Sequence, residues 1–158
     1  MKENVSVVIV HFNTPDSLKR SLATLYSTSE HVEVIVVDNA STKKIESVKQ
    51  MFPRAKWIEN ELNFGFSFAN NQGFLHSHGR WLLFLNADVE MSSKQVYDMF
   101  RFAEQEGLDA LSPTPVDGRY QKNVPTFQSI LQEFSSVHRV IGSIGGEMTL
   151  TGGCLMIN

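Results

Sequence analysis

Short apolar runs alternate along the chain with segments in which apolar residues recur at helical spacing. Most runs are rich in valine, isoleucine and leucine, as is typical of strands that are buried on both faces of a sheet. Because the alternation continues from residue 5 to about residue 113, it predicts an α/β fold with a mostly parallel, Rossmann-like sheet flanked by helices. The predicted strands are 5–12, 32–38, 55–60, 81–86 and 108–113.

The first two helices are expected between the first three strands. One spans 15–27, where Thr14 can cap the N-terminus while a proline and an acidic residue occupy the first turn. The next opens at Ser41 or Thr42 and ends at Pro53, with apolar residues on its inner face.

Two further helices follow the third and fourth strands. Residues 63–79 are predicted to form a loop that enters a helix, which Gly79 closes past its C-terminus. Residues 92–107 are predicted to form a capped helix that stops at Gly107. A glycine beyond the last turn favours a helix end because it adopts the left-handed conformation without strain.

The last third of the chain is less periodic. Residues 114–147 are expected to hold loops, short strands and a helix near 127–135, before 148–158 return to a strand pattern. An apolar strand is an unusual place for a domain to stop, so we expect a truncated piece of a longer domain. The predicted organisation is a single domain at 1–158, with an α/β core at 1–113 and the irregular segment plus returning strand at 114–158.

Charge and cysteine content narrow the class of protein. The 158 residues carry a net charge of −3, which gives no electrostatic footprint for a nucleic acid. The one cysteine, Cys154, cannot form an internal disulfide, which fits a reducing, cytoplasmic compartment. No apolar run approaches the roughly 20 residues that span a bilayer.

Polar side chains stand where the predicted strands end. In an open α/β sheet, ligands bind outside the carboxyl ends of the strands, so these residues are expected to line one rim. Two neighbouring asparagines inside the third helix are unfavourable for a helix, and a ligand would explain them. The rim residues are His11, Asn13, Asp38, Asn39, Asn63, Gly65, Asn70, Asn71, Asn86 and Asp88.

Each rim residue also has a structural alternative. Asn13 and Asn39 are of a type that serves turns and caps well, and Asp38 could cap the helix after it. His11 is interpreted as a packed strand-end histidine in preference to a catalytic base. The aromatic residues of the same region are expected in core or loop packing: Phe64, Phe66, Phe68 and Phe74.

Asp88 is the strongest candidate for a metal-coordinating residue. A carboxylate at a strand tip, two residues after the amide of Asn86, suits a divalent ion shared with a substrate phosphate. Mg²⁺ and Mn²⁺ both accept such oxygen ligands. The alternative is that Asp88 caps the next helix, but Ser92 or Ser93 is better placed for that role.

Five segments in order combine these strands and polar residues: "VSVVIVHFN", "VIVVDNAST", "NFGFSFANNQG", "LLFLNADVE" and "LTGGCLMIN". They resemble family 2 glycosyltransferases with the GT-A fold, in particular rhamnosyltransferase-like enzymes of cell-surface polysaccharide synthesis. An apolar strand that ends in aspartate is common. Five matching segments at suitable spacing, over nearly the whole chain, are specific.

The resemblance implies a nucleotide-sugar site. Asn86 and Asp88 match the ends of the family's Asp-x-Asp motif in an Asn-x-Asp variant, so Asp88 would hold Mn²⁺ or Mg²⁺ against the diphosphate of the donor. Asp38 matches the aspartate that holds the nucleoside. The segment from His11 to Asn13 would line the base pocket.

Two further segments of the family carry donor-binding residues. Asn63, Gly65 and Asn70 match the segment that packs over the nucleoside and the diphosphate. Gly152 and Gly153 match the strand that passes beside the donor sugar and the acceptor. These roles are implied by the resemblance alone.

The implied reaction transfers a sugar from a UDP- or dTDP-sugar to a hydroxyl of a glycan or lipid-linked acceptor, with inversion. Such enzymes often work at the cytoplasmic face of the membrane, which implies peripheral membrane association. The family's general base is an Asp or Glu shortly after the "TGG" strand, and the chain ends at Asn158 before any such residue. The chain could therefore bind a donor without transferring the sugar, and an unsupported sheet edge would favour a homo-oligomer.

Other functions are weighed against this one. The main alternative is a non-catalytic nucleotide-sugar-binding module or an inactive remnant. A sugar nucleotidyltransferase would need a glycine-rich loop with Arg or Lys after the first strand, and "HFNTPDSLKR" lacks it. A dinucleotide dehydrogenase would need G-x-G-x-x-G at the same place.

Overall fold

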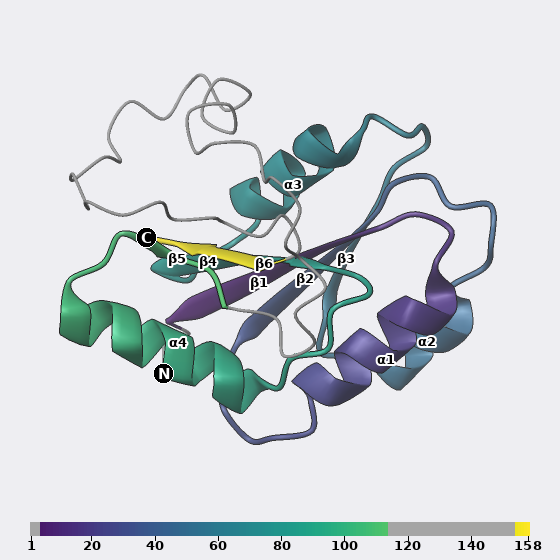
Figure 1. Cartoon of the computed structure of the whole chain (residues 1–158). Helices are drawn as coiled ribbons and strands as arrows, with labels where there is room; N and C mark the ends of the chain where they lie inside the picture. Colours follow the sequence, from purple (N-terminus) through teal and green to yellow (C-terminus); the bar gives the residue numbers. More distant parts are fainter. Residues whose placement is uncertain (1–3, 114–153) are drawn as a thin grey trace.

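The computed structural model describes residues 4–113 and 154–158, and its centre is one sheet of six strands (Figure 1). The order across the sheet is β3-β2-β1-β4-β6-β5. The strands are β1 (Val5–His11), β2 (Glu33–Asp38), β3 (Lys56–Glu59), β4 (Trp81–Asn86), β5 (Ala110–Leu111) and β6 (Cys154–Ile157).

The sheet is mostly parallel, with β1 at the centre of its parallel part. β1 pairs in parallel with both β2 and β4, and β2 pairs in parallel with β3. β6 runs antiparallel to β4 and to β5. The predicted α/β fold with a mostly parallel sheet is therefore confirmed, and the returning strand expected in 148–158 contains β6.

Helices cover both faces of this sheet. Figure 1 shows α1, α2 and α4 on one face and α3 on the opposite face. Within the described residues, the helices are α1 (Pro15–Leu25), α2 (Glu46–Met51), α3 (Phe66–Leu75) and α4 (Ser93–Glu106). None of the helices in the described part has the length and apolar character that a membrane span requires.

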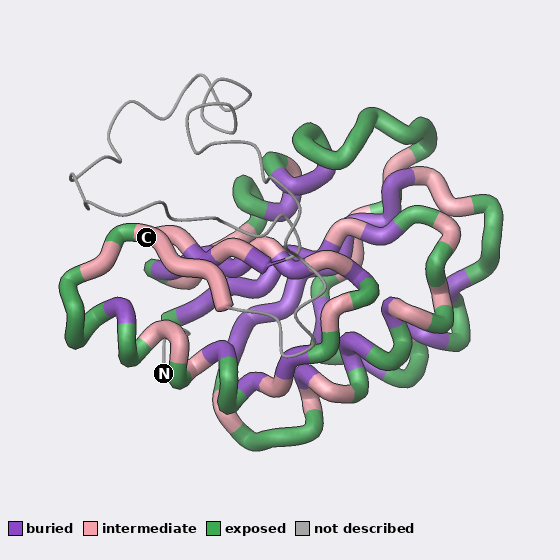
Figure 2. The backbone as a smooth tube through the Cα atoms, in the orientation of Figure 1, coloured by how far each residue is buried: buried purple, intermediate pink, exposed green. Residues whose placement is uncertain are grey.

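Alternate strand residues fill two cores of unequal size. Buried positions run along the strands and along the helix sides that face them (Figure 2). Gly73 lets α3 approach β1 closely, because a Cβ atom at this position would lie 2.3 Å from Val8 Cγ1. The larger core, against α1, α2 and α4, includes Val7, Ile9, Leu22, Val48 and Val96. The smaller core, under α3, includes Val8, Ile35, Val37, Ala69 and Leu82.

The start of the second helix differs from the prediction. α2 begins at Glu46, not at Ser41 or Thr42, and is only six residues long. The reason is that Ser41 is engaged in a turn after β2, where its backbone N donates to Asp38 Oδ1 at 3.0 Å. Thr14 likewise makes no capping hydrogen bond to α1, because its Oγ1 lies 3.0 Å from His11 Nδ1.

The third helix also ends differently from the prediction. α3 stops at Leu75, with His76 as its C-cap, so Gly79 is not the residue that closes it. Gly79 instead crosses β1, where its N donates to Ser6 Oγ and a Cβ atom would lie 2.5 Å from Ser6 N. The glycine is needed for this close approach between two backbone segments.

The fourth helix follows the sequence prediction. Ser92 caps α4 and exchanges hydrogen bonds with Gln95 in a capping box, and Gly107 ends the helix with φ +64°. The strand expected at 108–113 is limited to the two residues of β5. The helix expected near 127–135 lies outside the described residues.

A buried carboxylate closes the amino edge of the sheet. Glu33 is only 5% exposed, and its oxygens accept hydrogen bonds from Ser6 Oγ, from His78 N and from Lys56 Nζ. Burial alone would raise the pKa of Glu33, but the hydrogen bonds from Lys56, Ser6 and His78 outweigh it and lower the pKa to about 2. The carboxylate thus joins β1, β2, β3 and the segment that leads into β4.

Replacing Glu33 should change how stability depends on pH. A carboxyl group whose pKa falls from 4.5 to about 2 on folding stabilises the native state above pH 4.5, and that stabilisation is lost as the pH falls through 2. The full shift would correspond to about 3 kcal/mol, and solvent screening of the exposed Lys56 and His78 partners makes the expected contribution smaller than that. Glu33→Gln should be less stable at pH 6, and its deficit relative to the natural chain should shrink between pH 5 and pH 2.

Urea unfolding at pH 6, 4 and 3 measures this deficit. Glu106→Gln, at an exposed position at the end of α4, is the matched control and should follow the natural chain throughout. A deficit for Glu33→Gln that stays constant with pH would show that the ionised carboxylate does not stabilise this edge.

Candidate functional site

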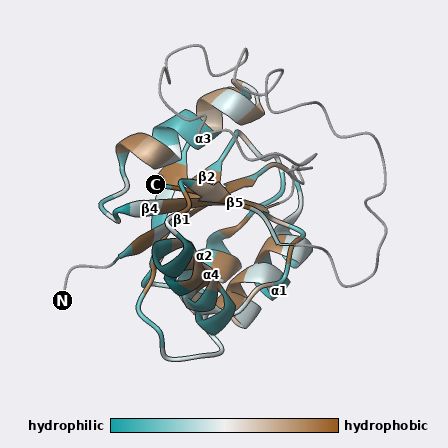
Figure 3. Ribbon diagram, turned by 60° about the vertical axis from the view of Figure 1, so that its left-hand side comes forward, coloured by the Kyte–Doolittle hydropathy of each residue, from teal (hydrophilic) through white to brown (hydrophobic). Residues whose placement is uncertain are grey.

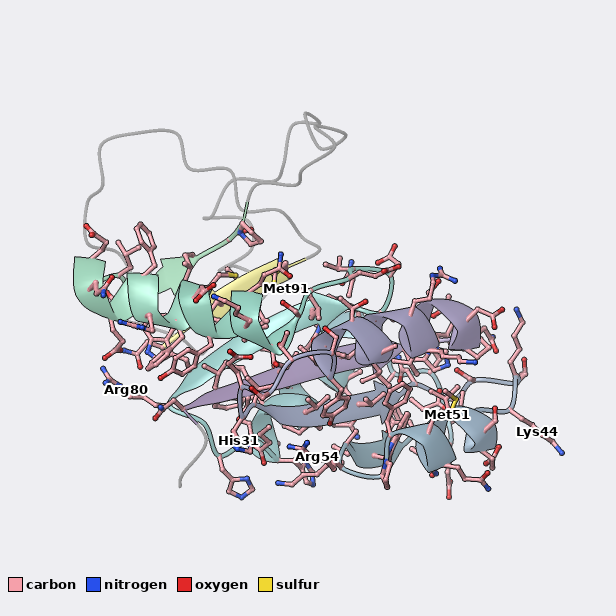
Figure 4. All side chains as sticks on the ribbon, turned by 90° about the horizontal axis from the view of Figure 1, so that it is seen from below. His31, Lys44, Met51, Arg54, Arg80 and Met91 are labelled. Atoms are coloured by element: carbon pink, nitrogen blue, oxygen red, sulfur yellow. The ribbon has the colours of Figure 1, made fainter. Side chains whose placement is uncertain are left out.

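The carboxyl ends of the central parallel strands form one edge of the sheet. His11 lies opposite Asp38 in the pairing of β1 with β2, and Val10 lies opposite Asn86 in the pairing of β1 with β4. The structure therefore brings the predicted rim residues of the first, second and fourth strands to one edge. Figure 4 shows Lys44, from the loop after β2, at the end of the molecule opposite Arg80, which precedes β4.

The strand-end residues share this edge but point to different faces. By strand alternation, His11 follows Val7 and Ile9 toward α1, and Asp38 follows the β2 residues that face the same larger core. Asn86 follows Leu82 toward the face that α3 covers. A ligand at this edge could meet the first two side chains from one side of the sheet and the amide from the other.

Asn13 ties the turn after β1 to the loop after β2. Its backbone N donates to Ser41 Oγ at 2.8 Å, and its Oδ1 accepts from Thr42 N at 2.8 Å and from Lys43 N at 3.1 Å. Asn13 has φ +57°, a left-handed conformation that asparagine tolerates better than most residues. These contacts fit the interpretation of Asn13 as a turn residue, and they hold together the two loops at the carboxyl edge of the sheet.

Asp38 keeps one carboxylate oxygen available. Its Oδ1 accepts from Ser41 N, whereas Oδ2 has no hydrogen-bond partner among the described residues. The alternative that Asp38 caps the next helix is wrong, because α2 begins at Glu46 with Ile45 as its N-cap. The side chain is 7% exposed, so it lies within the edge and does not project from it.

His11 is fully buried beside Asp38. Its Nδ1 lies 3.0 Å from Thr14 Oγ1, and its Nε2 has no partner within the part of the chain that the structure describes. Burial lowers the pKa of His11, and the charge of Asp38 opposes that effect only in part. The imidazole is therefore neutral at pH 7, and its position agrees with the packed strand-end interpretation.

Asn39 connects the end of β2 to the segment before α3. It is 2% exposed, and its side chain forms hydrogen bonds to Asn60, Asn63, Phe64 and Gly65. The sequence predicts Asn39 on the rim, with a turn or cap residue as the alternative. The sequence does contain a signal for these hydrogen bonds, which is the group of amide residues at 39, 60, 63 and 72. Which of them form hydrogen bonds with one another depends on tertiary structure.

The segment before α3 places its predicted residues in different environments. Asn63 and Gly65 are exposed, and Asn63 Oδ1 accepts from Gly65 N at 2.9 Å. Gly65 has φ +87° and ψ 165°, a conformation that is essentially restricted to glycine. Asn70 is buried and donates from Nδ2 to Phe66 O within the helix, whereas Asn71 is exposed.

The phenylalanines of this region are not in the core. Phe64, Phe66, Phe68 and Phe74 are all between 48% and 54% exposed, so the core alternative is wrong for them. The rings of Phe64 and Phe68 contact each other with centroids 4.9 Å apart, which is local packing between loop and helix. Figure 3 shows α3 coloured as hydrophobic at both ends and hydrophilic in its middle.

Asp88 lies in a tight turn after β4. The backbone N of Val89 donates to Asn86 O at 3.0 Å, which places Asp88 at an exposed corner of the turn. Its carboxylate has no hydrogen bond or ion pair with the described residues. The alternative that Asp88 caps α4 is excluded, because Ser92 makes that cap.

The donor set at Asp88 limits which metal site it could form. No group of three or more His, Cys, Asp or Glu residues that could hold a metal ion occurs in residues 4–113 and 154–158. A site built from protein ligands alone does not fit this set. A Mg²⁺ or Mn²⁺ ion held by one carboxylate together with phosphate oxygens and water does fit.

Comparisons with known proteins found a matching family model and several similar proteins. The family model described as "Glycosyl transferase family 2" matches residues 6–156. An uncharacterized glycosyltransferase from Methanocaldococcus jannaschii is 29% identical over 110 residues, which cover 65% of this chain and 38% of that protein. The uncharacterized glycosyltransferase YibD from Escherichia coli K12 is 25% identical over 131 residues, covering 80% of this chain and 38% of that protein.

Solved structures share the fold at low sequence identity. TarS 1-349 from S. aureus, in complex with UDP-GlcNAc, is 24% identical with a TM-score of 0.61, covering 80% of this chain and 37% of that one. The mannosyltransferase PcManGT from Pyrobaculum calidifontis, in complex with GDP-Man and Mn²⁺, is 15% identical with a TM-score of 0.68, covering 99% and 45%. The GT-A type of fold expected from the resemblance is thereby confirmed.

Two substitutions at Asn13 should separate its hydrogen bonds from its backbone conformation. Asn13→Gly keeps the φ of +57° without strain but loses the bonds to Thr42 and Lys43, so we expect a loss of about 1–2 kcal/mol. Asn13→Ala loses the same bonds and adds strain of about 1 kcal/mol. Urea unfolding of both variants measures the two effects, and a glycine variant as stable as the natural chain would contradict the first.

Proposed function

Because the chain belongs to glycosyltransferase family 2, we propose that it binds a nucleoside-diphosphate sugar at the carboxyl edge of its sheet. The proposed reaction is transfer of that sugar to an acceptor hydroxyl with inversion. The observation that carries the proposal is that Asp38 and Asp88 lie at the ends of β2 and β4, on the edge where open α/β sheets bind ligands. Both carboxylates keep oxygens without a partner among the described residues.

Asp38 is proposed to hold the nucleoside. Its Oδ1 is fixed by Ser41 N, which orients Oδ2 to accept a hydrogen bond from a ribose hydroxyl or from a ring N–H. UDP- and dTDP-sugars are the proposed donors because a pyrimidine is common in the family, and uracil and thymine both present a ring N–H that Asp38 could bind. The turn from His11 to Asn13 is proposed to line the base pocket, with the neutral His11 packed behind it.

Asp88 is proposed to hold Mn²⁺ or Mg²⁺ together with the diphosphate of the donor. The proposal is supported by the exposed, unpaired carboxylate and by the Mn²⁺ and GDP-Man of the mannosyltransferase that shares the fold. When bound, such an ion neutralises charge on the leaving diphosphate as a Lewis acid. Asn86 is proposed to contact the donor from the face of the sheet that α3 covers.

The donor sugar and the acceptor side of the reaction remain predictions from the family resemblance. Gly152 and Gly153 are proposed to pass beside the donor sugar and the acceptor, and both lie outside the described residues. A rhamnosyl donor, a glycan or lipid-linked acceptor, a place at the cytoplasmic membrane face, a homo-oligomer and a role in polysaccharide synthesis belong to the same proposal. The general base is expected from a segment after the "TGG" strand.

Removing the Asp88 carboxylate should abolish the metal-dependent part of nucleotide binding. Calorimetry with UDP, in the presence and absence of Mn²⁺, should show that Mn²⁺ strengthens binding to the natural chain by about tenfold or more, or about 1.4 kcal/mol. Asp88→Ala should bind UDP with equal affinity in both conditions.

The matched control is Asp109→Ala, which removes an exposed carboxylate directly before β5. This control should keep the response to Mn²⁺. If Mn²⁺ still strengthens UDP binding to Asp88→Ala as much as to the natural chain, Asp88 is not the metal ligand. If the natural chain binds neither UDP nor dTDP nor GDP, the proposed function itself is wrong.

A further inference from the structure

The segment from Asn60 to Gly65 connects β3 to α3 with little packing of its own. Residues 61–65 are all exposed, and two of them, Asn63 and Gly65, are proposed to cover the nucleoside and diphosphate. An exposed connection of this kind is ordinarily mobile, which would make it a poor wall for a ligand. The hydrogen bonds that hold it converge on one buried side chain.

Asn39 uses its complete hydrogen-bonding capacity on this segment. Its Nδ2 donates to Asn63 Oδ1 at 2.7 Å and to Gly65 O at 3.2 Å. Its Oδ1 accepts from Asn60 Nδ2 at 3.1 Å and from Phe64 N at 3.2 Å. A primary amide has two donor hydrogens and two acceptor lone pairs, so none is left for another partner.

The orientation of this amide is determined by the backbone. Phe64 N can only donate, and Gly65 O can only accept. If the oxygen and nitrogen of the Asn39 amide were exchanged, its nitrogen would face the Phe64 N–H and its oxygen would face Gly65 O, so both hydrogen bonds would be lost. Asn63 is fixed in the same way, because its Oδ1 also accepts from Gly65 N. The hydrogen bonds therefore select one conformation of the segment.

The backbone of Asn39 is also held by the sheet. Asn39 N donates to His11 O, and Asn60 N donates to Asp38 O, both at 2.9 Å, so the pairing of β1, β2 and β3 continues one step past the strands. Asn60 also exchanges two side-chain hydrogen bonds with Gln72 of α3. We call Asn39, Asn60, Asn63 and Gln72 the amide cluster.

We propose that Asn39 is a positioning residue, which holds the segment from Asn60 to Gly65 in the shape that covers the nucleoside without contacting the donor itself. The proposal rests on the proposed function for the identity of the ligand. The geometry of the segment is independent of that function. The amide cluster thus links the sheet edge to α3 and to the segment before it, through hydrogen bonds between side chains and to the backbone of Phe64 and Gly65.

Asn39→Asp is the most informative substitution, because it preserves the shape of the side chain while it replaces the two donor hydrogens with a second acceptor oxygen and a negative charge. A carboxylate at this position would face Asn63 Oδ1 and Gly65 O, which are both acceptors. Asparagine at 39 is 2% exposed, so water cannot replace the lost donors. The segment should therefore detach while β1 and β2 remain paired.

The experiment combines hydrogen exchange with nucleotide binding. In Asn39→Asp, the amides of Phe64 and Gly65 should exchange about tenfold faster than in the natural chain, the effect of losing a hydrogen bond, whereas amides within β1 and β2 should not change. The affinity for UDP should fall by about tenfold or more. The factor by which Mn²⁺ strengthens binding should stay the same, because Asp88 is untouched.

Asn4→Asp is the matched control, since it makes the same change at an exposed position at the amino edge and should alter neither readout. The natural chain gives a measurement that needs no variant: the Phe64 amide should exchange at least about tenfold slower than that of Leu62 in the same exposed segment. Equal rates for these two amides would overturn the proposal.

The remaining outcomes are also decisive. Faster exchange of Phe64 and Gly65 with unchanged UDP affinity would show that the segment does not cover the nucleoside. Weaker UDP binding with unchanged exchange would show that residue 39 acts on the donor by contact or by charge and not through the segment, which also overturns a positioning role. If the natural chain binds no nucleotide, the proposed function fails, while the exchange rates still decide whether Asn39 holds the segment.

Discussion

The parallel pairing of β1 with both β2 and β4 is the constraint on which the rest of the structure depends. It aligns His11 with Asp38 and Val10 with Asn86, and so fixes which polar residues meet at the carboxyl edge. A shift of either register by one residue would turn every side chain of that strand to the other face. The two apolar cores oppose such a shift, because β1, β2 and β4 each contribute alternate residues to both.

At the carboxyl edge, hydrogen bonds from side-chain amides, and not helix caps, hold the loops together. Asn13 binds the loop after β2, and Asn39 binds the segment before α3, in each case across a large separation in sequence. An amide can donate and accept at once, so one buried residue can satisfy backbone groups of both kinds. The carboxylate of Asp38 takes part in this structure only through Oδ1, which accepts from Ser41 N, and Asp88 takes no part in it among the described residues.

The strands and the last helix could be predicted because their signals are local. Apolar runs identify buried strands, and α4 carries both its capping box and its terminal glycine in its own sequence. The start of α2 could not be predicted, since Ser41 binds Asp38 and Asn13 instead of capping. The hydrogen bonds of Asn39 could not be predicted either, because its side-chain partners lie more than twenty residues further along the chain.

The exposed phenylalanines and the buried Glu33 depart from the usual distribution of residue types for related reasons. α3 meets the sheet through small residues, Ala69 and Gly73, so its large aromatic side chains are left on the outer side. Glu33 is buried at the amino edge because Ser6, Lys56 and His78 supply donors to both of its oxygens. Hydrophobicity alone predicts neither outcome, since both depend on which partners tertiary structure provides.

The two ends of the sheet therefore use carboxylates in opposite ways. Glu33 is satisfied by protein donors, and its charge stabilises the fold above pH 4.5, an effect that is lost as the pH falls through its lowered pKa of about 2. Asp88 is exposed on a turn, with no partner among the described residues, and contributes no such contact. A carboxylate that the protein has already paired would have to break hydrogen bonds to bind a cation, whereas an unpaired one needs only to exchange water. This difference, more than the sequence motif, supports the proposal that Asp88 binds a metal ion at the carboxyl edge.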